Sequence, residues 1–331
     1  MKKKDTILIT GGAGFIGSHL AEHLINKYNI IIVDNLSSGK KENLKSVIKK
    51  IKFFKLDLSN INLVDYFKKI QKIDYIFHLA ALADIVPSIN NPIDYVRSNI
   101  LGTYNILELA KVKKVKKIIY SASSSCYGLA SEIPTKISSK KDTQYPYAHT
   151  KYIAEQAILH WSKVYGVKYL SFRFFNVYGP RARTNGTYGA VFGTFLAQIL
   201  NKAPITIVGN GKQKRDFIYI LDVVYLLEKS LKSKIINKIY NVGFGKPRTI
   251  NDLVKMLKYN KIEYIPKRPG EPFVTHAEID KTKKDFNWSP KITLEMGVDL
   301  MIKNIDYWKD APVWTKKKIK EATKVWFEKL S

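Results

Sequence analysis

The chain has 331 residues, of which 45% are hydrophobic and 25% are charged, with a formal net charge of +28 at pH 7. This composition is typical of a soluble globular protein and excludes a disordered or fibrous chain, while the length suits one large domain or a large domain with a smaller lobe. A single cysteine, Cys126, excludes an internal disulfide, and we expect a small buried side chain there, no secretory leader, no membrane span and a cytoplasmic protein.

The positive charge by itself would suggest a nucleic-acid partner. The lysines, however, are spread through every segment, without an aromatic-interleaved basic stripe, so we interpret them as a solvated surface and expect no nucleic-acid binding. Arginine is rare and therefore more informative, because a planar guanidinium binds phosphate and carboxylate in a bidentate way. The seven arginines are Arg97, Arg173, Arg181, Arg183, Arg215, Arg248 and Arg268.

The first predicted strand, residues 7–10, runs into the glycine-rich turn 11–17, and a helix is predicted over 18–27. Glycines at 12, 14 and 17 fit the dinucleotide-binding fingerprint, and those at 11, 14 and 17 fit its longer-spaced variant. The glycines allow a tight turn and a close approach of backbone to a pyrophosphate at the helix N-terminus. This stretch predicts a dinucleotide site.

The second predicted strand, residues 30–33, ends in Asp34 and Asn35. An acid at this distance from the glycine turn binds the ribose hydroxyls of NAD, and no arginine stands beside it to accept the 2′-phosphate of NADP. The alternative is an ordinary turn acid at the end of a strand.

Further strands are predicted over 51–56, 75–79 and from 117, with an amphipathic helix over 92–111. The three strands lead into Asp57-Leu58, into Ala80-Ala81 and into the serine segment 121–128, in that order. Because an open α/β sheet binds its ligands at the carboxyl ends of its strands, these residues are candidate ligand contacts. Core packing and a helix cap are the alternatives for the alanines and the serines.

Tyr147 and Lys151 lie four residues apart at the start of another predicted helix, so both side chains leave the same face. An ammonium near a phenol favours the phenolate, and we expect Lys151 to lower the pKa of Tyr147 toward the working pH. Such pairs also occur by chance in lysine-rich helices. The glycine turn and the serine segment favour a catalytic pair.

Together these motifs resemble the extended short-chain dehydrogenase/reductase family, specifically its NAD-dependent nucleotide-sugar epimerases and dehydratases, over essentially the whole chain. The motifs are GGAGFIGSHL, Asp34-Asn35, Asp57-Leu58, HLAA at 78–81, SSSCYG at 123–128, Tyr147-x-x-x-Lys151, RFFNVYGPR at 173–181, RDF at 215–217, NVG at 241–243 and KRPGEP at 267–272. The resemblance implies an α/β fold with a Rossmann-type doubly wound parallel sheet in an NAD-binding domain, 1–177. Some later segments return to this domain, and 178–331 mainly form a smaller α/β lobe for the nucleotide sugar.

The resemblance also implies the roles of individual residues. The catalytic residues are Ser123, Tyr147 and Lys151. NAD contacts are expected from Gly11, Gly14, Phe15, Ile16, Gly17, Asp34, Asn35, Ser38, Gly39, Asp57, Leu58, Leu79, Ala80, Ala81, Asn99, Tyr147, Lys151 and Phe175. Substrate contacts, most simply with a UDP-sugar, are expected from Ser123, Asn176, Arg215, Arg268 and Glu271. The family pattern further implies a homodimer joined through helices 92–111 and 147–165, and the chain shows no metal-ligand spacing.

The reaction is inferred from what the serine segment lacks. The 4,6-dehydratases of the family carry an Asp-Glu pair before Tyr-Gly, where this chain has serines and a cysteine. We therefore predict a 4-epimerase that oxidises the sugar at C4 with NAD and returns the hydride to the other face. A nucleotide-sugar 4-dehydrogenase or 4,6-dehydratase is the alternative, and a non-catalytic NAD-binding regulator is a remote one.

A few positions refine this prediction. Asp84 predicts a sugar with an amino group or several hydroxyls, and Thr275 stands where some epimerases use a large aromatic residue to exclude 2-acetamido sugars, which predicts that such sugars are accepted. The loop with Arg181 and Arg183 is predicted to close over the substrate. His78 is expected in the core and His149 on the surface.

Overall fold

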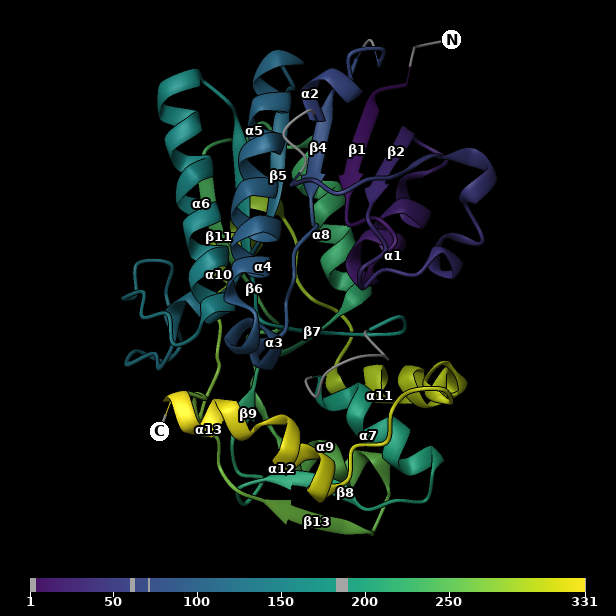
Figure 1. The fold of residues 1–331 in the computed structure, drawn as a ribbon, viewed down its shortest axis with the longest axis vertical. Coiled ribbons are helices and arrows are strands. Elements are labelled where there is room, and N and C mark those ends of the chain that lie inside the picture. Colours follow the sequence, from purple (N-terminus) through teal and green to yellow (C-terminus); the bar gives the residue numbers. More distant parts are fainter. Residues whose placement is uncertain (1–3, 60–62, 71, 183–189, 331) are drawn as a thin grey trace.

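The computed structural model describes residues 4–59, 63–70, 72–182 and 190–330. Its centre is a seven-stranded sheet in the order β11-β6-β5-β4-β1-β2-β3, with every neighbouring pair parallel (Figure 1). The predicted doubly wound sheet is thus confirmed. Its strands are β1 (Thr6–Thr10), β2 (Asn29–Asp34), β3 (Lys52–Lys55), β4 (Tyr75–His78), β5 (Lys117–Ser123), β6 (Tyr169–Phe174) and β11 (Lys238–Val242).

Helices cover both faces of this sheet. On one face lie α2 (Leu63–Tyr66), α5 (Gly102–Val112) and α6 (Pro146–Tyr165); on the other lie α1 (Phe15–Leu24) and α8 (Ile220–Lys232) (Figure 1). Side chains alternate along β1, so that Ile7 and Ile9 pack with α1 while Leu8 packs with α5 and α6. The inner strands β1, β4, β5 and β6 are largely buried, which explains their mostly apolar sequences, whereas the edge strand β3 is only partly buried and begins and ends with lysine.

The predicted helix 92–111 is one helical run with a change of pitch. It consists of α4 (Pro92–Tyr95), a π-helical segment Val96–Leu101 and α5, and Asn99 is buried within the π-helical part. Helix α1 starts at Phe15, three positions before the predicted start, because the last glycine of the turn already has helical backbone. Short helical segments complete this half: Lys41–Leu44, Ile48–Lys50, α3 (Ile85–Asn90) and Ser124–Tyr127.

A smaller lobe lies below the carboxyl ends of the strands in Figure 1. Two strand pairs in it are β8 with β13 (parallel) and β9 with β12 (antiparallel), while β7 pairs with β10 beside the main sheet. Later segments return to the sheet domain, because β11 pairs with β6 and α8 packs on α1. The remaining elements are β7 (Asn176–Tyr178), α7 (Val191–Leu200), β8 (Ile205–Val208), β9 (Lys214–Arg215), β10 (Phe217–Tyr219), β12 (Arg248–Thr249), α9 (Ile250–Leu257), β13 (Ile262–Ile265), α10 (Asp280–Phe286), α11 (Leu294–Lys303), Ile305–Trp308, α12 (Lys316–Ala322) and α13 (Lys324–Leu330).

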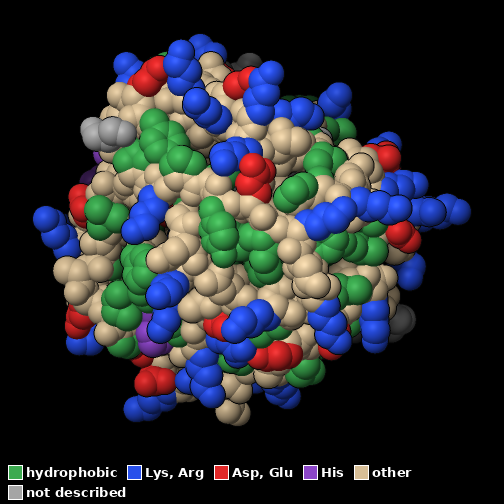
Figure 2. Space-filling view, turned by 90° about the horizontal axis from the view of Figure 1, so that it is seen from below, with side chains coloured by type: hydrophobic (Ala, Val, Ile, Leu, Met, Phe, Trp, Pro, Cys, Tyr) green, Lys and Arg blue, Asp and Glu red, His purple; other side chains and the backbone are tan. Residues whose placement is uncertain are grey.

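The surface agrees with the interpretation of the lysines as solvating groups. On the face shown in Figure 2, lysine and arginine side chains are dispersed among acidic and apolar ones and form no single basic stripe. In the described part of the chain, no helix is long and apolar enough to cross a membrane.

A buried ion pair ties α6 to the sheet. Arg173 on β6 and Glu155 on α6 are 2% and 1% exposed at their side chains, and their closest N–O distance is 2.6 Å. The same guanidinium donates to the hydroxyl of Tyr127 at 2.8 Å, and that hydroxyl donates to Asn241 on β11 at 2.7 Å. The network therefore joins α6, β6, β11 and the end of the serine segment through fully partnered polar groups.

Replacing Glu155 with Gln should destabilise the protein strongly. The change leaves the Arg173 charge buried without its counter-charge, which costs about 3–5 kcal/mol of unfolding free energy. The control is Glu328→Gln in the exposed Lys324–Glu328 pair, which should change that free energy by less than about 1 kcal/mol. Denaturant titration measures both, and equal effects would show that the buried pair has no special role.

Candidate active site

A cavity of about 610 Å³ lies at the carboxyl edge of the sheet and is lined by residues of both the sheet domain and the lobe. It brings together most of the predicted site residues, although they come from distant parts of the sequence. Those that line it are Gly11, Gly14, Phe15, Ile16, Gly17, Asp34, Asn35, Ser38, Asp57, Leu58, Leu79, Ala80, Ala81, Ser123, Tyr147, Lys151, Phe175, Asn176, Arg215, Arg268 and Glu271.

The glycine turn is packed so tightly that side chains are excluded from it. Gly11 has φ +67°, and a Cβ there would lie 2.7 Å from the backbone nitrogen of Ala80. A Cβ on Gly17 would lie 2.3 Å from the carbonyl oxygen of Gly11. The turn therefore lets the N-terminus of α1, with its unpaired backbone N–H groups, open onto the cavity, which fits a dinucleotide pyrophosphate.

Asp34 lies at the end of β2 beside this turn and is 7% exposed. Its carboxylate accepts hydrogen bonds from the backbone of Ala13 at 2.9 Å and of Leu36 at 2.8 Å. Burial raises the pKa of Asp34, and these two hydrogen bonds oppose the rise. Each oxygen keeps a lone pair for a ribose hydroxyl, so the residue fits the expected role.

Two predicted cofactor residues, Gly39 and Asn99, are not among the described residues that line the cavity. Gly39 lies behind the Asp34 carboxylate, since a Cβ on it would be 2.9 Å from an oxygen of Asp34. The amide of Asn99 is occupied by the backbone of Leu82 and by the hydroxyl of Thr150 on α6. The positions of Gly39 and Asn99 therefore suit residues that hold the lining residues in place from behind.

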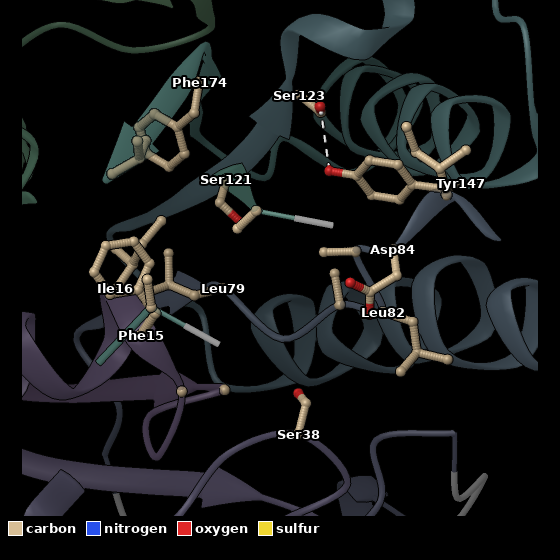
Figure 3. Close-up of a pocket in the computed structure, with 18 of the residues that line it drawn as sticks. Phe15, Ile16, Ser38, Leu79, Leu82, Asp84, Ser121, Ser123, Tyr147 and Phe174 are labelled. Atoms are coloured by element: carbon tan, nitrogen blue, oxygen red, sulfur yellow. Dashed lines mark hydrogen bonds between the residues drawn. The ribbon is translucent and has the colours of Figure 1, made fainter. Parts of the chain in front are cut away.

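The three predicted catalytic residues all line the cavity. The hydroxyl of Tyr147 lies 3.2 Å from that of Ser123 (Figure 3), and Ser123 is also 2.7 Å from the hydroxyl of Ser125. The ammonium of Lys151 lies 4.3 Å from the centre of the Tyr120 ring. Ser123 ends β5 and the other two project from the first turns of α6, as the sequence predicted.

The electrostatics of this trio differ from the expectation. Burial raises the pKa of Tyr147 in the protein alone, and hydrogen bonds with Ser123 and Ser125 oppose this rise. Burial also lowers the pKa of Lys151 to about 7, with Glu155 opposing this shift. Desolvation is the largest cause of both shifts, so the lowering of the Tyr147 pKa that the four-residue spacing predicted is not found in the protein alone.

Replacing Ser123 with Ala should move the pH dependence of activity. The change removes the larger of the two hydrogen-bond contributions that lower the pKa of Tyr147, so the phenol becomes harder to deprotonate. The acidic limb of kcat/KM against pH should therefore shift to higher pH. Ser123→Thr keeps the hydroxyl and should retain the original limb, whereas an unmoved limb in Ser123→Ala would separate this serine from the ionisation of Tyr147.

Charged residues of the lobe form the other end of the cavity. Glu271 accepts a hydrogen bond from Arg215 at 2.7 Å and lies 3.6 Å from Arg268. Burial alone would raise the pKa of Glu271, but the charges of Arg268 and Arg215 outweigh it and hold that pKa below its usual value. Two guanidiniums share one carboxylate, which leaves positive charge for an anionic ligand such as a diphosphate.

Comparison with known proteins agrees with this geometry. Residues 7–243 match the model of the NAD dependent epimerase/dehydratase family. The chain belongs to this family. The match covers the glycine turn, the three predicted catalytic residues and Arg215, and it ends before Arg268 and Glu271.

Individual relatives cover nearly the whole chain. It is 37% identical to a UDP-glucuronate 4-epimerase of Thermodesulfobacterium geofontis over 88% of this chain and 93% of the relative. Two solved structures superpose closely. The first is UDP-glucose 4-epimerase of Thermotoga maritima with UDP-glucose, which has a TM-score of 0.86 and 34% sequence identity and covers 92% of this chain and 99% of that one. The second is UDP-glucuronic acid 4-epimerase of Bacillus cereus with UDP-glucuronic acid and NAD, which has a TM-score of 0.83 and 30% sequence identity and covers 92% of this chain and 99% of that one.

Other predicted positions have mixed outcomes in this member of the family. Asp84 lines the cavity and points into it from the start of α3 (Figure 3). Arg181 also lines it, paired with Glu22 of α1 at 2.8 Å, whereas Arg183 lies outside the described residues. Thr275 is not among the described lining residues; its hydroxyl donates to Asn176 at 2.9 Å.

The remaining single-residue expectations hold. His78 is buried between the hydroxyls of Thr10 and Thr103, and burial lowers its pKa to about 3. His149 is exposed. Cys126 is buried in a small apolar cluster, and burial raises its pKa to about 12.

Sequence reasoning missed several residues that line the cavity. Tyr307 and Trp326 reach it from the last part of the chain, where no local motif marks them. Ser121 lines it as well and donates a hydrogen bond to the carbonyl of His78. Aromatic residues in a lysine-rich terminal segment were the only available signal for the first two.

Proposed function

We propose that this protein is a nucleotide-sugar 4-epimerase that uses NAD and takes a UDP-sugar. The observation that carries the proposal is that one cavity is lined by three groups: a dinucleotide turn, the hydrogen-bonded pair Tyr147 and Ser123, and the Arg215-Glu271-Arg268 cluster. A cofactor bound at the first and a nucleotide diphosphate bound at the last would place the sugar at the pair. The solved neighbours named above, with UDP-sugars and NAD, support the same arrangement.

The residues of the chain would divide the chemistry as follows. The glycine turn and Asp34 would hold NAD, which supplies a hydride acceptor that can return the hydride. The phenolic oxygen of Tyr147 takes the proton of the C4 hydroxyl, and Ser123 donates a hydrogen bond to the oxygen as it becomes a carbonyl. Lys151 keeps positive charge in the pocket when protonated, which favours the phenolate.

The serine segment supports epimerisation over dehydration. The only polar group of the Ser125 side chain is its hydroxyl, which is hydrogen-bonded to the hydroxyl of Ser123. The thiol of Cys126 is buried, and burial raises its pKa. Neither offers the carboxylate that elimination of water requires at this position. The ketone formed at C4 is therefore expected to be reduced again on its other face.

Turnover on a panel of nucleotide sugars tests the function. The wild-type protein should convert a UDP-sugar to its C4 epimer, resolved by NMR, without net accumulation of NADH. Tyr147→Phe should lower turnover by at least ~10²-fold while cofactor binding is retained, because the variant lacks the acid/base oxygen. A stable keto-sugar or accumulating NADH would instead identify the dehydratase or dehydrogenase, and near-normal turnover in the variant would remove Tyr147 from the mechanism.

We further propose that 2-acetamido sugars are accepted, on the basis of the small side chain at Thr275. Its hydroxyl donates a hydrogen bond to Asn176, a cavity residue, so Thr275 lies behind the lining beside a predicted substrate contact.

Thr275→Tyr should therefore reduce kcat/KM for a UDP-2-acetamido sugar by about tenfold or more relative to UDP-glucose, because the larger ring occupies space beside Asn176. Parallel assays with both sugars provide the measurement. Unchanged relative activity on the 2-acetamido sugar would contradict this specificity.

A homodimer is the proposed assembly. Apolar residues stand exposed on the outer helices of the sheet domain, namely Ile93, Val96, Leu101, Val112, Val164 and Tyr165. They suit a four-helix contact with a second copy, and the molar mass in solution tests this. We also propose a cytoplasmic location, where the thiol of Cys126 stays reduced.

A further inference from the structure

The C-terminal helix α13 brings an aromatic side chain into the nucleotide end of the cavity. Trp326 is 2% exposed and is one of the lining residues, although it stands five residues from the end of the chain. The proposed function gives it no role. Its neighbours are the residues that carry the positive charge of the lobe.

Trp326 makes two polar contacts with one short turn. Its indole N–H donates to the carbonyl of Pro269 at 2.8 Å, and its ring faces the guanidinium of Arg268, whose central carbon is 5.4 Å from the ring centre. The next residue, Gly270, has φ +67°, so the turn needs an unusual backbone conformation. One side chain thus fixes both the backbone of this turn and the charged group that leaves it.

These contacts extend toward the anion-binding groups. Arg268 is 11% exposed at its side chain and lies 3.6 Å from Glu271, which is bonded to Arg215 at 2.7 Å. The order Trp326, Arg268, Glu271, Arg215 therefore runs from the C-terminal helix into the cavity. A flexible arginine binds more weakly than one held in place, because ordering its side chain on binding costs conformational entropy.

Helix α13 itself is held by both halves of the molecule. It contacts α3 of the sheet domain, which begins directly after the cavity residue Asp84, while α12 before it packs through Ile319 onto Ile265 of β13. Figure 1 shows α12 and α13 crossing the lobe at the side that faces α3. Trp326 is therefore set on a fixed support at the rim of the cavity.

We propose that Trp326 is a positioning residue for nucleotide-diphosphate binding, which acts by holding Arg268 against the anionic end of the substrate. This inference rests on the proposed function, because the anion is taken to be the diphosphate of a nucleotide sugar. It assigns the terminal helix a part in substrate affinity beyond packing.

The test compares three variants in the full-length protein. Trp326→Leu removes the ring and the N–H, whereas Trp326→Phe keeps a ring under Arg268 and loses only the hydrogen bond. Phe327→Leu is the matched control: Phe327 is the next residue of α13, is half-buried and is not among the described lining residues. Binding of UDP and of NAD is measured by calorimetry, with KM and kcat for the UDP-sugar.

Trp326→Leu should weaken UDP binding about tenfold and raise KM by a similar factor, with kcat and NAD affinity nearly unchanged. Trp326→Phe should recover part of the affinity, and Phe327→Leu should bind UDP as the wild type does. This split between KM and kcat is what a purely structural role of the helix would not produce.

Three results would overturn the proposal: wild-type UDP affinity in Trp326→Leu, equal losses in Trp326→Leu and Phe327→Leu, or a parallel loss of NAD affinity. Failure of the proposed function is a different result. In that case the wild-type protein binds no UDP and turns over no UDP-sugar, before any variant is compared.

Discussion

The active site depends on one buried ion pair, between Glu155 of α6 and Arg173 of β6. It fixes the helix that carries Tyr147 and Lys151 at a defined position on the sheet, and it reaches through Tyr127 to the end of the serine segment. A buried pair of this kind adds little net stability compared with apolar packing, but it penalises any arrangement that leaves either charge alone. The ion pair and its hydrogen bonds thus hold together the elements that carry the hydroxyls of Tyr147 and Ser123, which lie 3.2 Å apart.

The same burial that fixes the site also sets its chemistry. Lys151 loses affinity for its proton and Tyr147 holds its proton more tightly, since neither charged form is well solvated. The positive charge of a bound pyridinium ring would act in this pocket with little screening. A site that resists ionisation until its cofactor is present is suited to a reaction in which the hydride must leave and return without side reactions with water.

Much of the fold and of the site followed from short-range patterns. Glycines 11 and 17 were predicted at the cavity because their roles are steric and local, and Asp34 because it ends the strand that follows the first helix; the structure places all three in the cavity lining. Asn99 and Gly39 were placed in the right neighbourhood, but whether a side chain faces the cavity or supports it depends on partners far away in sequence, such as Thr150 for Asn99. Trp326 and Tyr307 carried no motif at all and reach the cavity only because the chain folds back across the lobe.

By itself, the sequence determined the parallel sheet, the glycine-rich turn, the candidates Ser123, Tyr147 and Lys151, and the absence of a carboxylate in the serine segment, since each follows from residue type and spacing. Only the tertiary structure decided the direction of the pKa shifts of Tyr147 and Lys151, the pairing of Arg215 and Arg268 with Glu271, and the place of the C-terminal helix beside them. The physical reason is that desolvation and charge pairing depend on every group packed around a site, and those groups are assembled from the whole length of the chain.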